Sequence, residues 1–168
     1  MSVLNEVFST FDMLADLYGL EKIKTIGDAY MVVGGMPERS DDHAERIADM
    51  ALDLSSRVAG LAVPGAEGIT FRVGMHSGPA VAGVIGAKKF IYDVWGDTVN
   101  VASRMESHGV PGRIQVTQPV YERLRDRYLF ERRGFVDVRG KGPMATWFLV
   151  GPRSRASVDG GSSPLGAE

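Results

Sequence analysis

The side chains best suited to bind a phosphorylated ligand lie between Phe90 and Ser107, in the stretch FIYDVWGDTVNVASRMES. Its first part, Phe90 to Trp95, is mostly aromatic or β-branched, which predicts a short strand that Gly96 interrupts. Asp97 is then placed to cap a helix, because its carboxylate can accept hydrogen bonds from the free N–H groups of a first turn. The stretch therefore predicts a strand, a sharp turn and a helix.

Two faces of that helix differ in chemical character. Val101 and Met105 are four residues apart, as are Asn100 and Arg104, and residues four apart share a helix face. One face is therefore apolar and packs, while another presents an amide beside a guanidinium. Asp93 lies at the end of the strand that leads in. An acceptor, an amide and a fixed cation beside a strand-to-helix turn suit a phosphorylated ligand. Surface salt bridges are the alternative interpretation of the same charges.

A second stretch of interest is EKIKTIGDAYMVVGG, from Glu21 to Gly35. It predicts a β-hairpin with strands over 22–26 and 29–33. The turn is Gly-Asp, and glycine in its first place suits the type II′ geometry. From local sequence alone, Asp28 is an ordinary turn residue and Lys24 is a solvated charge on an edge strand.

Taken together, KIKTIGDAY and YDVWGDTVNVASRMES resemble the catalytic domain of class III nucleotidyl cyclases, of the mycobacterial adenylyl cyclase type. The resemblance runs from about Leu4 to Leu149, and two long motifs in order are far more specific than a lone glycine loop. It implies conversion of ATP to the signalling nucleotide 3′,5′-cyclic AMP and pyrophosphate. In the family the ribose 3′-hydroxyl attacks the α-phosphorus in line, assisted by two Mg²⁺ or Mn²⁺ ions.

The resemblance also assigns roles to individual residues. An ammonium and a carboxylate complement the N1 acceptor and the N6 amino donor of adenine. Guanylyl cyclases carry Glu and a small residue at those two positions. By their match to the family motifs, Lys24 and Asp93 would read adenine, Asn100 would orient the ribose, Arg104 would stabilise the transition state, Arg139 or Lys141 would bind the terminal phosphates, and Asp28 would bind metal. The family has lysine at the first phosphate position, so Arg139 is the first choice there.

One departure from the family concerns its first metal-binding aspartate. In the family this residue lies on a strand before the first helix, in a segment like FADIVGFT. No such segment occurs here, since the amphipathic pattern begins at Ser2. The sequence therefore predicts a cyclase domain that lacks its first strand and one metal ligand.

The family's active site lies between two head-to-tail domains, so the resemblance implies a homodimer or a heterodimer with another cyclase subunit. One alternative is a catalytically incomplete partner that binds ATP and completes a site on another subunit. A plain ferredoxin-like binding or dimerisation domain is a further alternative. The joint presence of Lys24, Asp93, Asn100 and Arg104 argues against it.

The remaining elements follow from hydrophobic periodicity and turn residues. We expect helices over 2–18, 43–61 and 118–128, and strands over 69–76, 113–117, 130–139 and 145–150, with 80–86 as a short strand or a tight crossing. This irregular alternation indicates an α+β fold. The family adds the expectation of a ferredoxin-like βαββαβ core, with an antiparallel-rich sheet and helices on one face. His43 is expected to be solvated and His76 to be packed or hydrogen-bonded.

Length and composition indicate the number of domains and exclude several classes of partner and cross-link. The 168 residues suit one catalytic domain over 1–150, followed by a Gly-, Ser- and Pro-rich tail over 151–168 that predicts disorder. The net charge of −2 does not suggest a nucleic-acid partner, and the absence of cysteine excludes disulfides. No apolar run reaches the roughly 18 residues of a membrane helix. A cytoplasmic setting fits, with the cytosolic domain of a longer membrane-anchored protein as the alternative.

Overall fold

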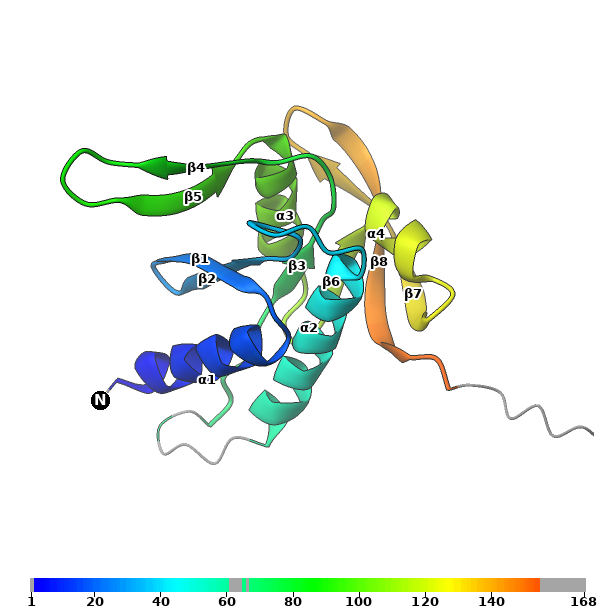
Figure 1. The fold of residues 1–168 in the computed structure, drawn as a ribbon. Coiled ribbons are helices and arrows are strands. Elements are labelled where there is room, and N and C mark those ends of the chain that lie inside the picture. Colours follow the sequence, from blue (N-terminus) through cyan, green and yellow to red (C-terminus); the bar gives the residue numbers. More distant parts are fainter. Residues whose placement is uncertain (1, 61–64, 66, 155–168) are drawn as a thin grey trace, which may run out of the picture.

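The computed structural model describes residues 2–60, 65 and 67–154. Its elements alternate between helices and strands without a fixed repeat (Figure 1). In chain order they are α1 (Val3–Leu17), β1 (Glu21–Ile26), β2 (Ala29–Val33), α2 (His43–Ala59), β3 (Val73–Met75), β4 (Val81–Ile85), β5 (Ile91–Trp95), α3 (Asp97–Ser107), β6 (Ile114–Thr117), α4 (Gln118–Leu124), β7 (Tyr128–Val138) and β8 (Gly142–Pro152). The expected α+β class is confirmed.

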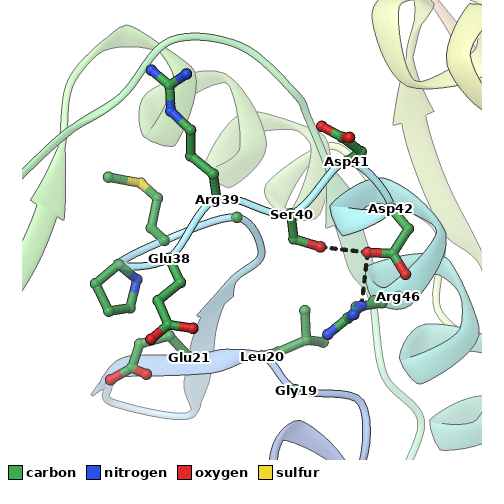
Figure 2. A pocket seen from close by; sticks show the side chains of 12 residues that line it. Gly19, Leu20, Glu21, Glu38, Arg39, Ser40, Asp41, Asp42 and Arg46 are labelled. Atoms are coloured by element: carbon green, nitrogen blue, oxygen red, sulfur yellow. Dashed lines mark hydrogen bonds and ion pairs between the residues drawn. The ribbon is translucent and has the colours of Figure 1, made fainter.

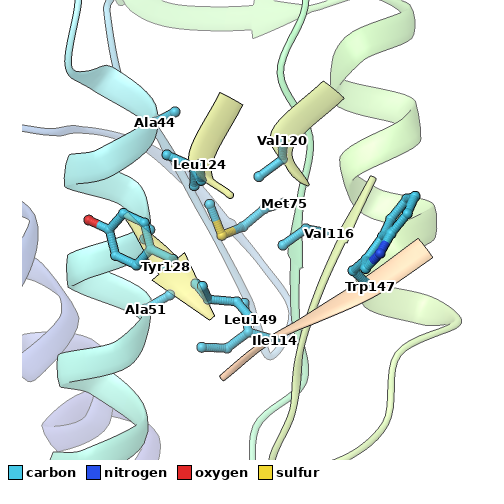
Figure 3. Close-up of a cluster of buried hydrophobic side chains, with 11 residues drawn as sticks. Ala44, Ala51, Met75, Ile114, Val116, Val120, Leu124, Tyr128, Trp147 and Leu149 are labelled. Carbon is cyan, nitrogen blue, oxygen red and sulfur yellow. The ribbon is translucent and has the colours of Figure 1, made fainter. Parts of the chain in front are cut away.

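The largest sheet has the strand order β3-β6-β8-β7. β3 and β6 run parallel, whereas the β6–β8 and β7–β8 pairs are antiparallel. On one face of this sheet, side chains from β3, β6 and β8 pack against α2 and α4 (Figure 3). Val116 and Leu124 have no exposed surface there, so this layer is the main hydrophobic core.

The opposite face of the same sheet is covered by α3. Gly74 on β3 lies so close to this helix that a Cβ atom would come within 2.1 Å of the backbone N of Glu106. On β6 the fully buried Gln115 donates from Nε2 to the Met105 carbonyl oxygen of α3, at 3.2 Å. The helices thus cover both faces, which differs from the expected single covered face. Successive side chains of a strand point to opposite faces of the sheet, so Gly74 and Gln115 face away from α2 and towards α3.

A second core joins α1, the β1–β2 hairpin and α2. Phe11 of α1 makes edge-to-face contacts with Tyr30 and Phe71, with ring centroids 5.1 and 5.3 Å apart. Tyr30 also donates its hydroxyl to Asp12 Oδ1 at 2.7 Å. Leu14 is fully buried in this cluster, which holds the hairpin against the helix.

The remaining strands form two separate hairpins, β1–β2 and β4–β5. The β4–β5 hairpin extends away from the rest of the fold (Figure 1). Its side chains are unusually open for apolar residues, with Val84 62% and Phe90 76% exposed. The segment 80–86, expected as a strand or a tight crossing, is thus the first strand of this hairpin.

Several boundaries differ from the sequence-based expectation. The strand expected over 69–76 is restricted to β3, because Phe71 packs into the α1 core instead. The helix expected to reach 128 ends at Leu124, because Tyr128 begins β7 and its ring is buried beneath α2. His43 is not solvated: its ring packs beside Gly35, and burial lowers its pKa. β8 continues to Pro152, and residues 155–168 of the expected tail lie outside the described residues.

Candidate active site

Lys24 and Asp93 lie in direct contact although 69 residues separate them in the chain. Lys24 is on β1 and Asp93 is on β5, so the contact joins the two hairpins. The lysine Nζ lies 3.0 Å from Oδ1 and 3.1 Å from Oδ2. Asp93 Oδ1 also accepts from the Val94 N–H at 2.8 Å, and these hydrogen bonds, led by the one from Lys24, lower the pKa of the carboxyl.

This pair stays accessible, since the Lys24 side chain is 39% and the Asp93 side chain 21% exposed. An ammonium has three N–H donors, and a carboxylate has several acceptor positions. Both groups therefore keep hydrogen-bonding capacity for a ligand while they hold each other. A donor beside an acceptor can recognise a planar edge that presents the opposite pattern.

Helix α3 carries the next two candidates. Its apolar face is buried as predicted, with Val101 and Met105 almost fully enclosed. Asn100 and Arg104 are exposed and lie about one turn apart. Within the described part of the chain, Arg104 makes no ion pair, and the exposed amide of Asn100 and the exposed guanidinium are both open to a ligand.

The expectation that Asp97 caps this helix is wrong. The N-cap is Gly96, with φ of 121°, and no side chain caps the first turn. Asp97 is the first helical residue, and its Oδ2 accepts from Lys141 Nζ at 2.7 Å. The carboxylate thus bonds to the turn between β7 and β8. That turn also presents Arg139, which is exposed.

Asp28, the candidate metal ligand, lies in the exposed turn between β1 and β2. Glycine precedes it with φ of 59°, which agrees with the expected hairpin turn. Among the described residues, no group of three or more His, Asp or Glu side chains is placed to hold a metal ion. Asp28 alone therefore does not make a metal site, and its role stays a prediction.

One cavity lies away from these residues, near the start of β1 and the loop that leads into α2 (Figure 2). Its volume is about 570 Å³, and none of the seven candidate residues lines it. Its charged lining consists of Glu21, Glu38, Arg39, Asp41, Asp42 and Arg46. Asp42 pairs with Arg46 at 2.9 Å, which leaves an excess of carboxylates. Such a lining repels a triphosphate, so this cavity is not the nucleotide site.

Sequence reasoning missed the contacts that hold α3 in place. Near its first turn, Thr98 donates to the Pro79 carbonyl oxygen. At the other end, Gln115 donates to the Met105 carbonyl oxygen, and Arg133 hydrogen-bonds to the Gln115 side chain. A polar residue inside the apolar strand IQVT was the available signal for this network. His76, by contrast, is hydrogen-bonded as expected, with its Nδ1 2.7 Å from Thr117 Oγ1 of β6.

Comparison with known proteins identifies relatives over most of the chain. A family model described as the adenylate and guanylate cyclase catalytic domain matches residues 1–151. An adenylate cyclase of Mycobacterium tuberculosis strain H37Rv is 51% identical over 153 residues, which cover 91% of this chain and 34% of the relative. The chain thus spans about a third of the length of that curated relative.

Solved structures agree with the sequence comparison. The guanylate cyclase domain of RhGC from Catenaria anguillulae, in complex with GTP, superimposes with a TM-score of 0.86 at 36% identity, covering 91% of this chain and 84% of that one. A guanylyl cyclase domain of the RhoGC fusion protein from Blastocladiella emersonii, described as a non-canonical dimer, gives a TM-score of 0.82 at 33% identity, covering 89% of this chain and 82% of that one. The relatives therefore include proteins described as adenylate and as guanylate cyclases. No helix of the described residues is long and apolar enough to cross a membrane.

Proposed function

The chain belongs to the family of class III adenylate and guanylate cyclase catalytic domains, and we propose that it is an adenylyl cyclase domain that converts ATP to cyclic AMP and pyrophosphate. Family membership alone does not choose the base, because relatives of both kinds are similar to it. The observation that carries the choice is the contact between Lys24 and Asp93.

Adenine presents its N6 amino group as a donor and N1 as an acceptor on one edge. Asp93 can accept from N6 while Lys24 donates to N1, and the ammonium has a further donor for the carboxylate itself. Guanine presents the reverse pattern, with an O6 acceptor beside an N1–H donor. It would place its donor against the lysine and its acceptor against the carboxylate, leaving buried groups without partners.

The proposed reaction is an in-line displacement at the α-phosphorus. The ribose 3′-oxygen forms a bond to phosphorus, its proton is released, and the bond to the β-phosphate oxygen breaks to expel pyrophosphate. Asn100 would orient the ribose, and Arg104 would stabilise the negative charge that develops on the phosphate. Arg139 would bind the terminal phosphates, with Lys141 as the second candidate. Both α3 side chains are exposed, as these roles require.

Class III cyclases typically use divalent metal ions, and Mg²⁺ or Mn²⁺ would neutralise the phosphates and lower the pKa of the attacking hydroxyl. Asp28 is the family-based candidate ligand for such an ion. Because the described residues hold no complete metal site, the roles above rest on the side chains of the chain itself.

A second copy of the chain, or another cyclase subunit, would complete the site. The β4–β5 hairpin supports this proposal, since it exposes Val84, Phe90 and Trp95 by 62, 76 and 42%. An apolar surface of this kind on a projecting hairpin is suited to a protein interface. Asp28 of one subunit and Arg104 of the other would then serve one active site.

The alternative function is an ATP-binding partner that completes a site on a different cyclase subunit. The lack of a group of metal-binding side chains among the described residues favours this alternative. It predicts ATP binding without turnover by the chain alone. Turnover would appear after mixing with a second class III domain whose own Lys24 equivalent has been removed.

The test is to incubate the purified chain with Mn²⁺ and either ATP or GTP, and to measure cyclic nucleotide and bound nucleotide. We expect cyclic AMP with ATP and little product with GTP. ATP binding without product, rescued by the second domain, identifies the alternative. A preference for GTP, or no binding of either nucleotide, overturns both.

A further inference from the structure

The turn between β7 and β8 is attached to the start of α3 by one ion pair. Lys141 Nζ lies 2.7 Å from Asp97 Oδ2, across 44 residues of chain. The Lys141 side chain is 42% exposed and the Asp97 side chain 64% exposed, so burial alone does not hold the two groups together. Figure 1 shows the β7–β8 turn beside α3.

We infer that Asp97 and Lys141 are positioning residues whose ion pair fixes this turn over α3 and thereby places the neighbouring Arg139. This inference rests on the proposed cyclase function. It gives Lys141, the second phosphate-binding candidate, a structural role, and it leaves Arg139 as the first choice that the family resemblance implies. Lys141 is already held by a carboxylate, whereas Arg139 makes no ion pair within the described part of the chain.

The turn needs an external anchor because its own residues give little rigidity. Gly140 and Gly142 flank Lys141, with φ of 81° and 73°, a conformation that favours glycine. A Cβ atom at either position would have no neighbour within 4 Å, so the two glycines lie in open space. Within the turn, one backbone hydrogen bond runs from the Lys141 N–H to the Val138 carbonyl oxygen at 2.8 Å. The Lys141 side chain supplies the link to the rest of the fold.

Asp97 is a suitable anchor for two reasons. It lies in the first turn of α3, where the helix dipole favours a negative charge. That turn is itself fixed, since the neighbouring Thr98 donates to the Pro79 carbonyl oxygen. The same helix carries Asn100 and Arg104, so the ion pair sets the distance between Arg139 and the residues proposed to act on the α-phosphate.

The competing hypothesis is that Asp97 merely occupies Lys141 until the triphosphate displaces it. The two hypotheses give opposite results for Asp97→Asn. If the ion pair anchors the turn, its loss makes the turn more mobile, so the KM for ATP rises. A phosphate-binding lysine that is released from its carboxylate binds ATP more tightly, so the KM falls.

The experiment compares four variants of the full chain: Asp97→Asn, Lys141→Met, the charge swap Asp97→Lys with Lys141→Asp, and Lys22→Met. The last is a matched control, because Lys22 makes an exposed ion pair with Asp12 at 2.8 Å that is outside the proposed site. Two quantities are measured: kcat and KM with Mn²⁺-ATP, and amide hydrogen exchange of residues 139–142.

We expect each single variant at Asp97 or Lys141 to raise KM by about three- to fivefold, the range of an exposed ion pair, with kcat nearly unchanged. Exchange of residues 139–142 accelerates in the same variants. The charge swap returns both quantities toward the parent values, and Lys22→Met changes neither. Rescue by the swap cannot occur if Lys141 must contact phosphate.

A lower KM in Asp97→Asn, unchanged exchange in that variant, or a charge swap that fails to restore slow exchange overturns the inference. Failure of the proposed function is a separate result. If the parent chain makes no cyclic AMP, the hydrogen-exchange comparison still decides whether Asp97 and Lys141 hold the turn.

Discussion

Two regions of this molecule differ sharply in how their side chains are packed. In the layer of β3, β6 and β8 against α2 and α4, Val116 and Leu124 have no exposed surface. In the β4–β5 hairpin, more than half of the Val84, Ile85 and Phe90 surface is open. The candidate base-binding residues lie on the two hairpins, whereas Asn100 and Arg104 lie on a helix packed against the buried sheet. Burial is therefore concentrated in the sheet layer, whereas the candidate ligand-binding residues lie on the two hairpins and on the exposed face of α3.

The largest expected effect is on stability, and it is tested by removing one side chain from each of these two regions. Leu124→Ala leaves a cavity in the closed core, so we expect a loss of about 2–5 kcal/mol of unfolding free energy. Val84→Ala removes an exposed side chain and should change it by under about 0.5 kcal/mol. Urea unfolding of the two variants measures both. Equal losses would show that the hairpin is packed in solution.

The next effect concerns α3. Arg104 is exposed and Met105 beside it is fully buried, so Arg104→Ala should alter chemistry without altering stability. We expect kcat for ATP to fall by about 10²- to 10³-fold, as for loss of one transition-state donor. The ratio of ATP to GTP use should stay constant, because the role proposed for this residue is at the phosphate and not at the base.

Mixing two variants tests whether one active site draws on residues of two subunits. Asp28→Ala and Arg104→Ala should each lose most of their activity, yet mixing them should restore part of it if one site draws on two subunits. Lys24→Ala mixed with Arg104→Ala is the control, because both residues would belong to the same half-site. Activity in the control mixture but not in the first would contradict the proposed arrangement.

Base choice should give a change of similar or smaller size. Lys24→Glu with Asp93→Cys reverses the hydrogen-bonding pattern offered to the base, and each mismatched buried group costs about 1–3 kcal/mol. We expect kcat/KM for ATP to fall by roughly a hundredfold or more. Gain of GTP use is a weaker expectation, since guanine also needs its ring correctly placed. If the double variant keeps the parent preference for ATP, Lys24 and Asp93 do not take part in base recognition.

The smallest expected effect is on pH dependence. Burial lowers the pKa of His43 and of His76 below the ordinary value of 6.5. Between pH 6.5 and these lowered values the unfolded chain binds more protons than the folded one, so stability falls as the pH decreases. Urea midpoints at pH 8, 6.5 and 5.5 should show a small decrease between the first two, where the unfolded histidines begin to bind protons, and a larger decrease at the third. His76→Gln should reduce that decrease, whereas a substitution of the exposed His108 should leave it unchanged.

Local pattern was sufficient for elements whose packing repeats along the chain. The Val101 and Met105 face and the hairpin turn at Gly27 were predicted correctly because a helix period or a turn geometry fixes them within a few residues. Local pattern was insufficient where a contact with a residue distant in the sequence decides the role of a side chain. Asp97 has the residue type of a cap, yet it contacts Lys141 because the β7–β8 turn is adjacent in space.

The candidate site shows the same division. From local sequence, Lys24 was a solvated charge and Asp28 a turn residue, and only the family resemblance suggested roles. The contact of Lys24 with Asp93 spans 69 residues, with β2, α2, β3 and β4 between them in the chain, so no local rule could place the two together. The role of Asp28 stays a prediction.

The Lys24–Asp93 contact has a consequence for the entropy of nucleotide binding. Because each side chain restrains the other, the two groups are already oriented before a base arrives, and little side-chain freedom remains to be lost. The ammonium and the carboxylate each keep hydrogen-bonding positions that the contact between them does not use. A base with the complementary pattern would fill these positions at small entropic cost, whereas a base with the reverse pattern would set donor against donor and acceptor against acceptor. The same ion pair would thus serve both affinity for one base and discrimination against the other.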